Sequence, residues 1–243
     1  MNEGLFSGKA EIYAKFRPSY PTAIVDWLYD MTHAERVADI GAGTGIFTKC
    51  LTEKPWKVTA VEPNEDMLGE LRKTPDCEII KAGAENTGLE SGTIGLVTVA
   101  QAFHWFDVPL FKEECRRILI PKGIVCLLWN TVDESKDIVK KQNEMNLKYC
   151  GCCDGHTIGY TPQQSDDKIQ LFFEQCEKRQ FPNNLAFGLE EYIGNRLSRS
   201  YAPKKNDEGY EAYVKALTDF WNENSINGKI VIPNNVNCYT GTV

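Results

Sequence analysis

Three glycines in the segment from Val37 to Gly45 (VADIGAGTG) constrain this chain more than any other feature of its sequence. They follow a short strand pattern at 36–40 and precede a helical pattern of apolar residues. Glycine permits a tight turn and lets the backbone approach a ligand closely. The helix that follows would present unpaired N–H groups and the positive end of its dipole. The segment therefore predicts a nucleotide-type binding loop between a strand and a helix.

Strand and helix patterns alternate over residues 34–130. An opening helix is expected after Pro21, because Ile24, Trp27, Leu28 and Met31 recur at helical spacing. Strands are expected at 36–40, 57–61, 77–81, 94–100 and 124–129. Such alternation predicts an α/β, doubly wound fold, with a mostly parallel sheet and helices on both faces.

The alternation stops after residue 130. Helices are expected at 131–150, 164–177, 188–200 and 208–225, and then a closing pair of strands at 228–233 and 236–243, joined through Asn234 and Asn235. We expect one domain, in which residues 1–33 form a lid, 34–130 the ligand-binding core, 131–225 a helical insertion and 226–243 the closing strands. Ligands of open α/β sheets bind at the carboxyl edge, so the insertion over that edge would face the substrate.

An acidic residue and the glycine spacing together indicate the kind of cofactor. Glu62 ends the second expected strand, 21 positions after Gly41, where a carboxylate meets a ribose hydroxyl in nucleotide-binding βαβ units. A dinucleotide site has the spacing G-x-G-x-x-G, but position 46 is Ile. The spacing therefore disfavours NAD.

The glycine pattern, with Asp39 two residues upstream, resembles motif I of the class I S-adenosylmethionine (SAM)-dependent methyltransferases. Further motifs follow in that family's order: YAKFRPSYP at 13–21, GAE at 83–85, VAQAFHWFD at 99–107 and RILIPKG at 117–123. Together they resemble the small-molecule (type 11) group that contains trans-aconitate and ubiquinone-type C-methyltransferases. The likeness covers residues 10–130 and, more loosely, the closing segment. It implies a Rossmann-like fold and methyl transfer from SAM to a small organic acceptor, with S-adenosylhomocysteine as product.

The resemblance also implies which residues bind the cofactor: Tyr13, Arg17, Asp39, Gly41, Ala42, Gly43, Glu62, Met67, Ala84, Glu85 and Gln101. The glycine loop would lie against the methionyl part of SAM, with Asp39 at its amino end and Gln101 nearby. Tyr13 and Arg17 would belong to the lid, with Arg17 as a carboxylate partner.

The same resemblance implies which residues contact the ribose and the adenine of SAM. Glu62 would bind both ribose hydroxyls, and Met67 would pack near the adenine. Ala84 and Glu85 would bracket the adenine ring from the third strand.

The acceptor side offers fewer signals. A base is needed only if the acceptor must lose a proton, and His104 is the candidate because its ordinary pKa is near neutrality. The alternative is that His104 and Trp105 line the acceptor pocket. Trp129 and Asn130 end the fifth expected strand and would reach the acceptor, although Trp129 also suits a core position.

Composition narrows the class of protein. The chain has 27 Lys and Arg against 34 Asp and Glu, a net charge of −7, which counts against nucleic-acid partners. No leader and no membrane-length apolar run are recognisable, and nine cysteines without a disulfide-type pattern predict reduced thiols in a cytoplasm. The ligands in the segment from Cys150 to His156 are too crowded for zinc, so no metal is expected. A SAM-binding regulator without activity, and an RNA or protein methyltransferase, remain the alternatives.

Overall fold

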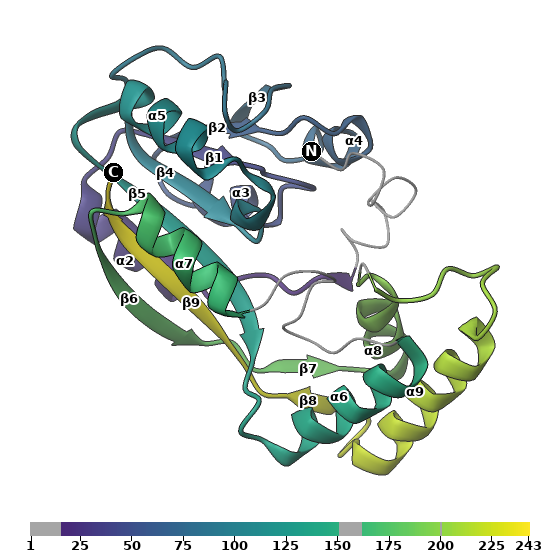
Figure 1. Ribbon diagram of the computed structural model, residues 1–243. Helices are drawn as coiled ribbons and strands as arrows, with labels where there is room; N and C mark the ends of the chain where they lie inside the picture. Colours follow the sequence, from purple (N-terminus) through teal and green to yellow (C-terminus); the bar gives the residue numbers. More distant parts are fainter. Residues whose placement is uncertain (1–15, 151–161, 200) are drawn as a thin grey trace.

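The computed structural model describes residues 16–150, 162–199 and 201–243 (Figure 1). Within these residues a seven-stranded sheet has the order β3-β2-β1-β4-β5-β9-β6. Its strands are β1 (Arg36–Ile40), β2 (Lys57–Val61), β3 (Cys77–Ile80), β4 (Ile94–Ala100), β5 (Leu119–Val132), β6 (Gln175–Pro182) and β9 (Asn234–Thr242). β1 to β5 run parallel, and β9 is antiparallel to both of its neighbours. The expected mostly parallel, doubly wound sheet is confirmed.

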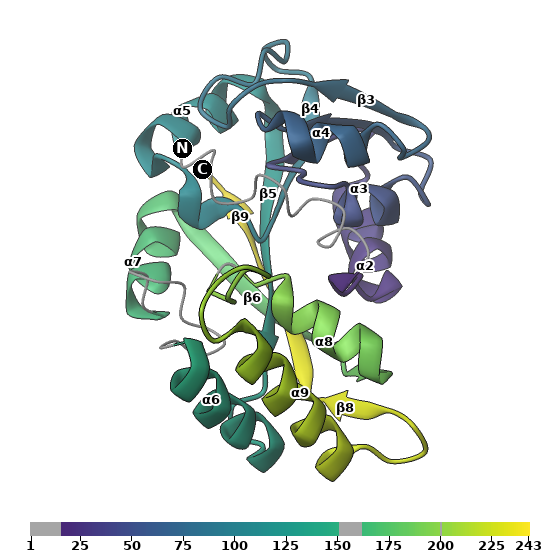
Figure 2. The same ribbon diagram turned by 90° about the vertical axis from the view of Figure 1, so that its right-hand side faces the viewer.

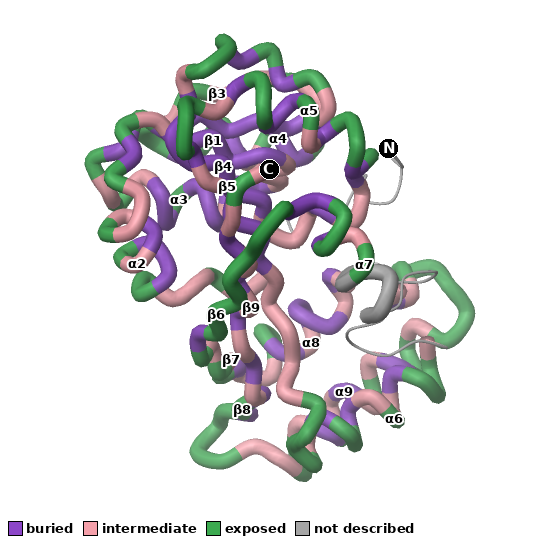
Figure 3. The backbone as a smooth tube through the Cα atoms, turned by 60° about the vertical axis from the view of Figure 1, so that its left-hand side comes forward, coloured by how far each residue is buried: buried purple, intermediate pink, exposed green. Residues whose placement is uncertain are grey.

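Helices cover both faces of this sheet. α2 (Thr22–Thr32) and α3 (Ile46–Leu51) share one apolar core with β1, β5 and β9. α5 (Val108–Ile118) and α7 (Pro162–Phe172) share the other core, while α4 (Glu65–Leu71) packs against β2. Figure 3 shows the central strands β1, β4 and β5 as the buried middle layer. Two independent apolar faces thus hold the sheet rigidly between helical layers.

The strand order reverses between β1 and β4. From β1 the chain adds β2 and β3 on one side, and then crosses to add β4 and β5 on the other. The loops after β1 and β4 therefore leave the sheet in opposite directions and open a crevice at its carboxyl edge.

The second half of the chain builds a lobe beyond the carboxyl end of β5 (Figure 2). It contains α6 (Asp137–Cys150), α8 (Leu189–Leu197), α9 (Tyr210–Asn224) and a two-stranded sheet of β7 (Leu185–Phe187) and β8 (Ile230–Ile232). Tyr192 and Tyr213 are fully buried in its apolar core. Their hydroxyls hydrogen-bond to Gln142 at 3.1 Å and to Asn146 at 2.9 Å, which fixes α8 and α9 against α6.

The prediction of one helix over 164–177 is wrong at its end. The helix stops at Phe172, and β6 begins at Gln175. β6 is the edge strand of the sheet, and all of its residues except Phe181 are exposed. An edge strand with two exposed faces has no apolar alternation, so its sequence carries no strand signal.

The predicted pairing of the closing strands with each other is also wrong. β8 pairs with β7, whereas β9 returns to the main sheet between β5 and β6. Asn234 and Asn235 belong to β9 rather than to a turn. Pro233 separates the two strands, and because proline lacks an N–H donor it suits the point where the chain leaves one sheet for the other.

Candidate active site

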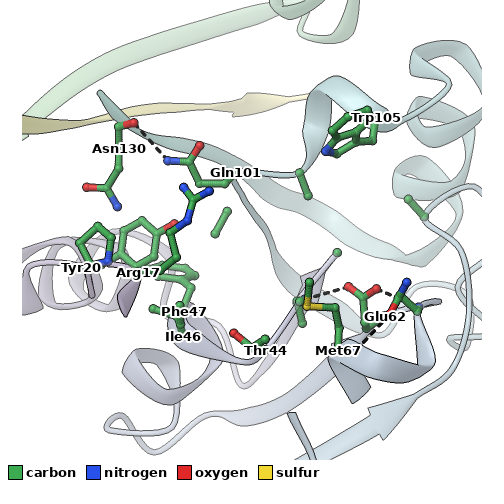
Figure 4. Close-up of a pocket in the computed structure, with 18 of the residues that line it drawn as sticks. Arg17, Tyr20, Thr44, Ile46, Phe47, Glu62, Met67, Gln101, Trp105 and Asn130 are labelled. Carbon is green, nitrogen blue, oxygen red and sulfur yellow. Dashed lines mark hydrogen bonds between the residues drawn. The ribbon is translucent and has the colours of Figure 1, made fainter. Parts of the chain in front are cut away.

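A cavity that is open to solvent lies at the carboxyl edge of the sheet. Predicted site residues that line it are Arg17, Gly41, Ala42, Gly43, Glu62, Met67, Ala84, Gln101 and Trp105. Asn130, which the sequence placed at a strand end, also lines it, together with Tyr20, Phe47, Leu185, Arg199 and Asn234. Figure 4 shows Glu62 and Met67 on one side of the view and Arg17, Tyr20, Gln101 and Asn130 on the other.

The glycine loop is tied to the end of β2. The N–H groups of Gly41 and Ala42 donate to the carbonyl of Val61 at 2.9 and 3.1 Å. A Cβ at Gly41 would meet the Cβ of Ala102 at 2.6 Å, so close packing requires glycine there. Gly43 has φ +57°, and a Cβ on it would meet nothing within 4 Å, because it faces the cavity. Gly41 thus serves packing, and Gly43 keeps space open for a ligand.

Glu62 is held by two backbone donors. Its Oε2 accepts from the N–H of Gly43 at 2.8 Å, and its Oε1 accepts from the N–H of Asn64 at 2.9 Å. Burial raises the pKa of this carboxyl, and the two hydrogen bonds oppose that rise. Each carboxylate oxygen has a further lone pair, so a fixed carboxylate that lines the cavity can accept from a pair of neighbouring hydroxyls.

Asp39 lies beneath the loop and outside the described wall of the cavity. Its carboxylate accepts from the hydroxyls of Thr48 at 2.7 Å and Thr98 at 2.9 Å. Burial raises its pKa to about 6, although the two threonine hydrogen bonds act in the opposite direction. In this position Asp39 joins β1, α3 and β4 under the loop. Its expected role toward SAM stays a prediction.

The turn after β4 is strained at Gln101. Its φ is +61°, a left-handed conformation that costs a non-glycine residue about 1–3 kcal/mol and persists where function or packing demands it. Its N–H donates to the carbonyl of Leu128 at 3.0 Å, and its Nε2 donates to the carbonyl of Asn130 at 3.2 Å. These contacts with β5 hold the side chain at the cavity wall.

The next residues form a short 3-10 helix, η1 (Phe103–Trp105). Phe103 and Phe106 are buried and anchor the loop in the core, and Trp105 lines the cavity. His104 lies outside the described wall, with its ring 4.7 Å from that of Trp105. Burial, assisted by the charge of Lys168, lowers the pKa of His104 to about 4. The imidazole is therefore neutral at physiological pH and only weakly basic.

Two other predicted residues, Trp129 and Glu85, lie outside the described cavity wall. Trp129 packs edge-on against Phe103 and Tyr239, at 6.2 and 5.8 Å between ring centroids. Its neighbour Asn130 lines the cavity because successive strand residues face opposite sides of the sheet. Glu85 accepts from the N–H of Asp107 at 2.9 Å and so holds the end of the β4–α5 loop. Tyr13 lies outside the described residues.

Helix α8 fastens the segment that carries Arg17. The Nδ2 of Asn195 donates to the carbonyl of Phe16 at 2.8 Å, and Nη2 of Arg17 donates to the carbonyl of Ser198 at 3.2 Å. A Cβ on Gly194 would meet the Phe16 ring at 2.6 Å, so only glycine permits this approach. Arg199 follows directly and lines the cavity. No motif or spacing marked Arg199 in the sequence, because it lies in the irregular second half.

Within the described ranges, no group of three or more His, Cys, Asp or Glu side chains could hold a metal ion. Of the Cys- and His-containing segment, only Cys150 is described, at the end of α6. No helix in the part of the chain that the structure describes is long and apolar enough to cross a membrane.

Known proteins resemble this chain in both sequence and fold. A family model described as a methyltransferase domain matches residues 38–127. A candidate methyltransferase of Dictyostelium discoideum is 35% identical over 227 residues, which cover 87% of this chain and 79% of that protein. An uncharacterized methyltransferase of Mycobacterium tuberculosis is 39% identical over 141 residues, 58% of each chain. The chain thus spans little more than half the length of that mycobacterial relative.

A solved structure of a candidate type II methyltransferase from Anaeromyxobacter dehalogenans matches with a TM-score of 0.70 at 21% identity, over 93% of this chain and 98% of that chain. A Haemonchus contortus phosphoethanolamine N-methyltransferase, solved with phosphomonomethylethanolamine and S-adenosylhomocysteine, matches with a TM-score of 0.53 at 16% identity, over 100% of this chain and 57% of that one. These structures share the fold, and the Dictyostelium relative extends the sequence match across most of the molecule. The chain belongs to the class I SAM-dependent methyltransferases.

Proposed function

We propose that this chain transfers a methyl group from SAM to a small organic acceptor and releases S-adenosylhomocysteine. The observation that carries the proposal is the Glu62 carboxylate, which two backbone N–H groups fix at the end of β2, facing the cavity. A carboxylate in this place accepts from the hydroxyls of a ribose in nucleotide-binding βαβ units.

The residues present fit SAM along the length of the cavity. Glu62 would hold the ribose, and Met67 and Ala84 supply apolar contact for the adenine nearby. Open space at Gly43 leaves room for the methionyl chain, and Arg17 would bind its carboxylate. SAM, when bound, supplies a methyl group already activated on a sulfonium.

The protein's contribution is then position and exclusion of water. In-line transfer requires that the acceptor be held rigidly, and correct placement alone lowers a barrier by several kcal/mol. Trp105, Phe47 and Leu185 supply apolar walls from three separate elements. His104 is neutral and lies outside the described wall, which favours a role in shaping the loop over a role in proton transfer.

A small acceptor is favoured over a macromolecule. The second half of the chain contributes Leu185, Arg199 and Asn234 to the cavity wall, so the lobe and the sheet surround one site. We therefore propose that the lid, the core, the helical insertion and the closing strands work as a single unit. A net charge of −7 also opposes binding to RNA.

Calorimetric titration of the whole chain with S-adenosylhomocysteine, with NAD in parallel, tests the cofactor. Micromolar binding of S-adenosylhomocysteine alone is expected, and binding of NAD alone would overturn the proposal. Release of S-adenosylhomocysteine from SAM is then measured with a panel of small acceptors. Tight cofactor binding with no turnover on any acceptor would instead support a regulator that binds SAM without using it.

A further inference from the structure

Two arginines, Arg17 and Arg199, line the cavity. We propose that the methyl acceptor carries a carboxylate, and that Arg199 and Asn130 bind it while Arg17 serves the cofactor. This inference rests on the proposed function, because it assigns the acceptor class of the same cavity.

Arg17 is hydrogen-bonded to the backbone next to Arg199. Nη2 of Arg17 donates to the carbonyl of Ser198, the residue before Arg199, at 3.2 Å. Figure 4 shows Arg17 beside Gln101, with Glu62 across the view. Arg17 therefore lies across the cavity from the Glu62 carboxylate, and Arg199 follows the residue to which Arg17 is hydrogen-bonded.

The charges of the site favour an anionic acceptor. Among the described residues that line the cavity, Glu62 is the single carboxylate, against the two arginines. SAM brings a sulfonium and an ammonium but only one carboxylate. One guanidinium suffices for that carboxylate, and a guanidinium has five N–H donors, so it can serve several partners at once. A cationic acceptor would meet like charge, whereas a carboxylate would be attracted.

The hydrogen bonds around Asn130 fix the orientation of its amide. Nδ2 of Asn183 donates to the carbonyl of Ser19 at 3.1 Å, and a carbonyl only accepts. That nitrogen also lies 2.8 Å from the side chain of Asn130, so the facing atom of Asn130 is its oxygen. Nδ2 of Asn234 donates to the same oxygen at 2.9 Å.

The nitrogen of the Asn130 amide is consequently a donor on the opposite side. In Figure 4 it points toward the part of the cavity where Arg17 and Tyr20 lie. An N–H donor and a guanidinium that line one cavity match the acceptor oxygens of a carboxylate, and hydrogen bonds to charged groups are the strong ones. Apolar neighbours such as Trp105 and Leu185 would cover the rest of a small molecule.

The test uses the whole chain saturated with S-adenosylhomocysteine. Calorimetry measures its affinity for matched pairs of small molecules: benzoate and benzamide, cinnamate and cinnamide, hexanoate and hexanamide. We expect one or more carboxylates to bind, and the amide of each to bind about 10-fold or more weakly. Equal affinity for acid and amide, or no carboxylate bound at millimolar concentration, overturns the inference.

Variants of Arg199 test whether this residue binds the acceptor carboxylate. Arg199→Gln should weaken carboxylate binding by about 10-fold or more and leave the affinity for S-adenosylhomocysteine unchanged, and Arg199→Lys should restore part of the loss. Arg116→Gln is the matched control, because Arg116 pairs with Glu174 on the exposed surface. Loss of S-adenosylhomocysteine binding instead would assign Arg199 to the cofactor and refute the inference.

Asn130→Asp provides a second test that does not alter either arginine. It keeps the oxygen that Asn183 and Asn234 contact and replaces the donor nitrogen by a second carboxylate oxygen. Carboxylate binding should fall, whereas amide binding should not. If the unmodified chain fails to bind S-adenosylhomocysteine at all, the proposed function fails first, and this outcome is distinct from every result with the acid and amide pairs.

Discussion

The carboxylate of Glu62 accepts a hydrogen bond from the backbone N–H of Gly43 at 2.8 Å. This contact joins the end of β2 to the turn after β1, so the carboxylate and the glycine loop form one unit. The loop thereby presents its open side to the cavity with the carboxylate already in position. Binding energy is then not spent on ordering the two parts.

Glu62→Gln should weaken binding of S-adenosylhomocysteine by about 1–3 kcal/mol, because a charged acceptor of two hydroxyls becomes a neutral amide. Titration calorimetry measures the dissociation constant. Glu90→Gln is the control, because Glu90 is exposed and lies outside the cavity wall. An unchanged dissociation constant for Glu62→Gln would contradict the assignment of the ribose site.

Gly43 and Gly92 form a matched pair. Their φ values are +57° and +66°, and a Cβ on either would meet nothing within 4 Å. Replacement of either glycine by leucine should therefore lower the free energy of unfolding by a similar amount, roughly 1–2 kcal/mol, because leucine is strained in the left-handed conformation. Only Gly43→Leu fills the cavity and should abolish binding of S-adenosylhomocysteine. Urea unfolding and calorimetry on both variants check this, and equal binding by the two would count against it.

Asp39 should make the stability of the chain depend on pH. Burial raises its pKa from 3.8 to about 6, so the folded protein holds a proton there that the unfolded chain has lost. This contribution is complete below pH 3.8 and disappears as the pH rises to about 6. The unfolding free energy, relative to that of Asp39→Asn, should therefore fall by up to about 3 kcal/mol over this range and stay level above it. Urea titrations at several pH values measure this difference, and a constant difference would refute the effect.

His104 should contribute little to proton transfer. Its pKa of about 4 means that its protonation does not change between pH 5.5 and 8, roughly, so that no limb of the kcat/KM profile in this range belongs to it. His104→Asn should lower turnover by less than about 10-fold, whereas loss of a general base costs roughly 10²–10⁴-fold. A loss of that size, together with a changed pH profile, would restore the base role.

Alanine substitutions at two helical glycines distinguish the effect of helix propensity on stability from the effect of a side-chain contact. A Cβ on Gly69 in α4 would meet nothing within 4 Å, whereas one on Gly194 in α8 would meet the Phe16 ring at 2.6 Å. Gly69→Ala should stabilise the chain by up to about 1 kcal/mol through helix propensity.

Gly194→Ala should instead displace the segment that holds Arg17. The overpacking should lower the free energy of unfolding by about 1–3 kcal/mol. It should also weaken binding of S-adenosylhomocysteine. Thermal unfolding and calorimetry on both variants measure the two effects. Matching behaviour of the two variants would show that the contact between α8 and Phe16 is unimportant.

The first half of the molecule was predictable because its signals are local and strong. Buried parallel strands such as β1 and β4 are continuous apolar runs, and the position of Glu62 relative to the glycines follows from the βαβ unit itself. The structure places Glu62, Gly43 and Gln101 around one cavity, and their roles toward the cofactor stay predictions.

The second half could not be predicted to the same depth. β6 lacks an apolar face, and the partners of β7 and β8 are set by contacts distant in sequence. Arg199 lines the cavity just after α8, where that helix contacts the segment from Phe16 to Arg17. Such a residue has no motif, and only the assembled fold reveals it.

The position of β9 has a consequence for the order in which the molecule is made. β9 lies between β5 and β6, and β6 pairs with it alone within the described sheet. Asn234 follows Asn130 by 104 residues, so a growing chain that has emerged only through β6 leaves the edge of β5 uncovered. Unpaired edges promote wrong association. The sheet therefore keeps an unpaired edge until β9 is inserted, and the wall of the cavity receives Asn234 at the same moment.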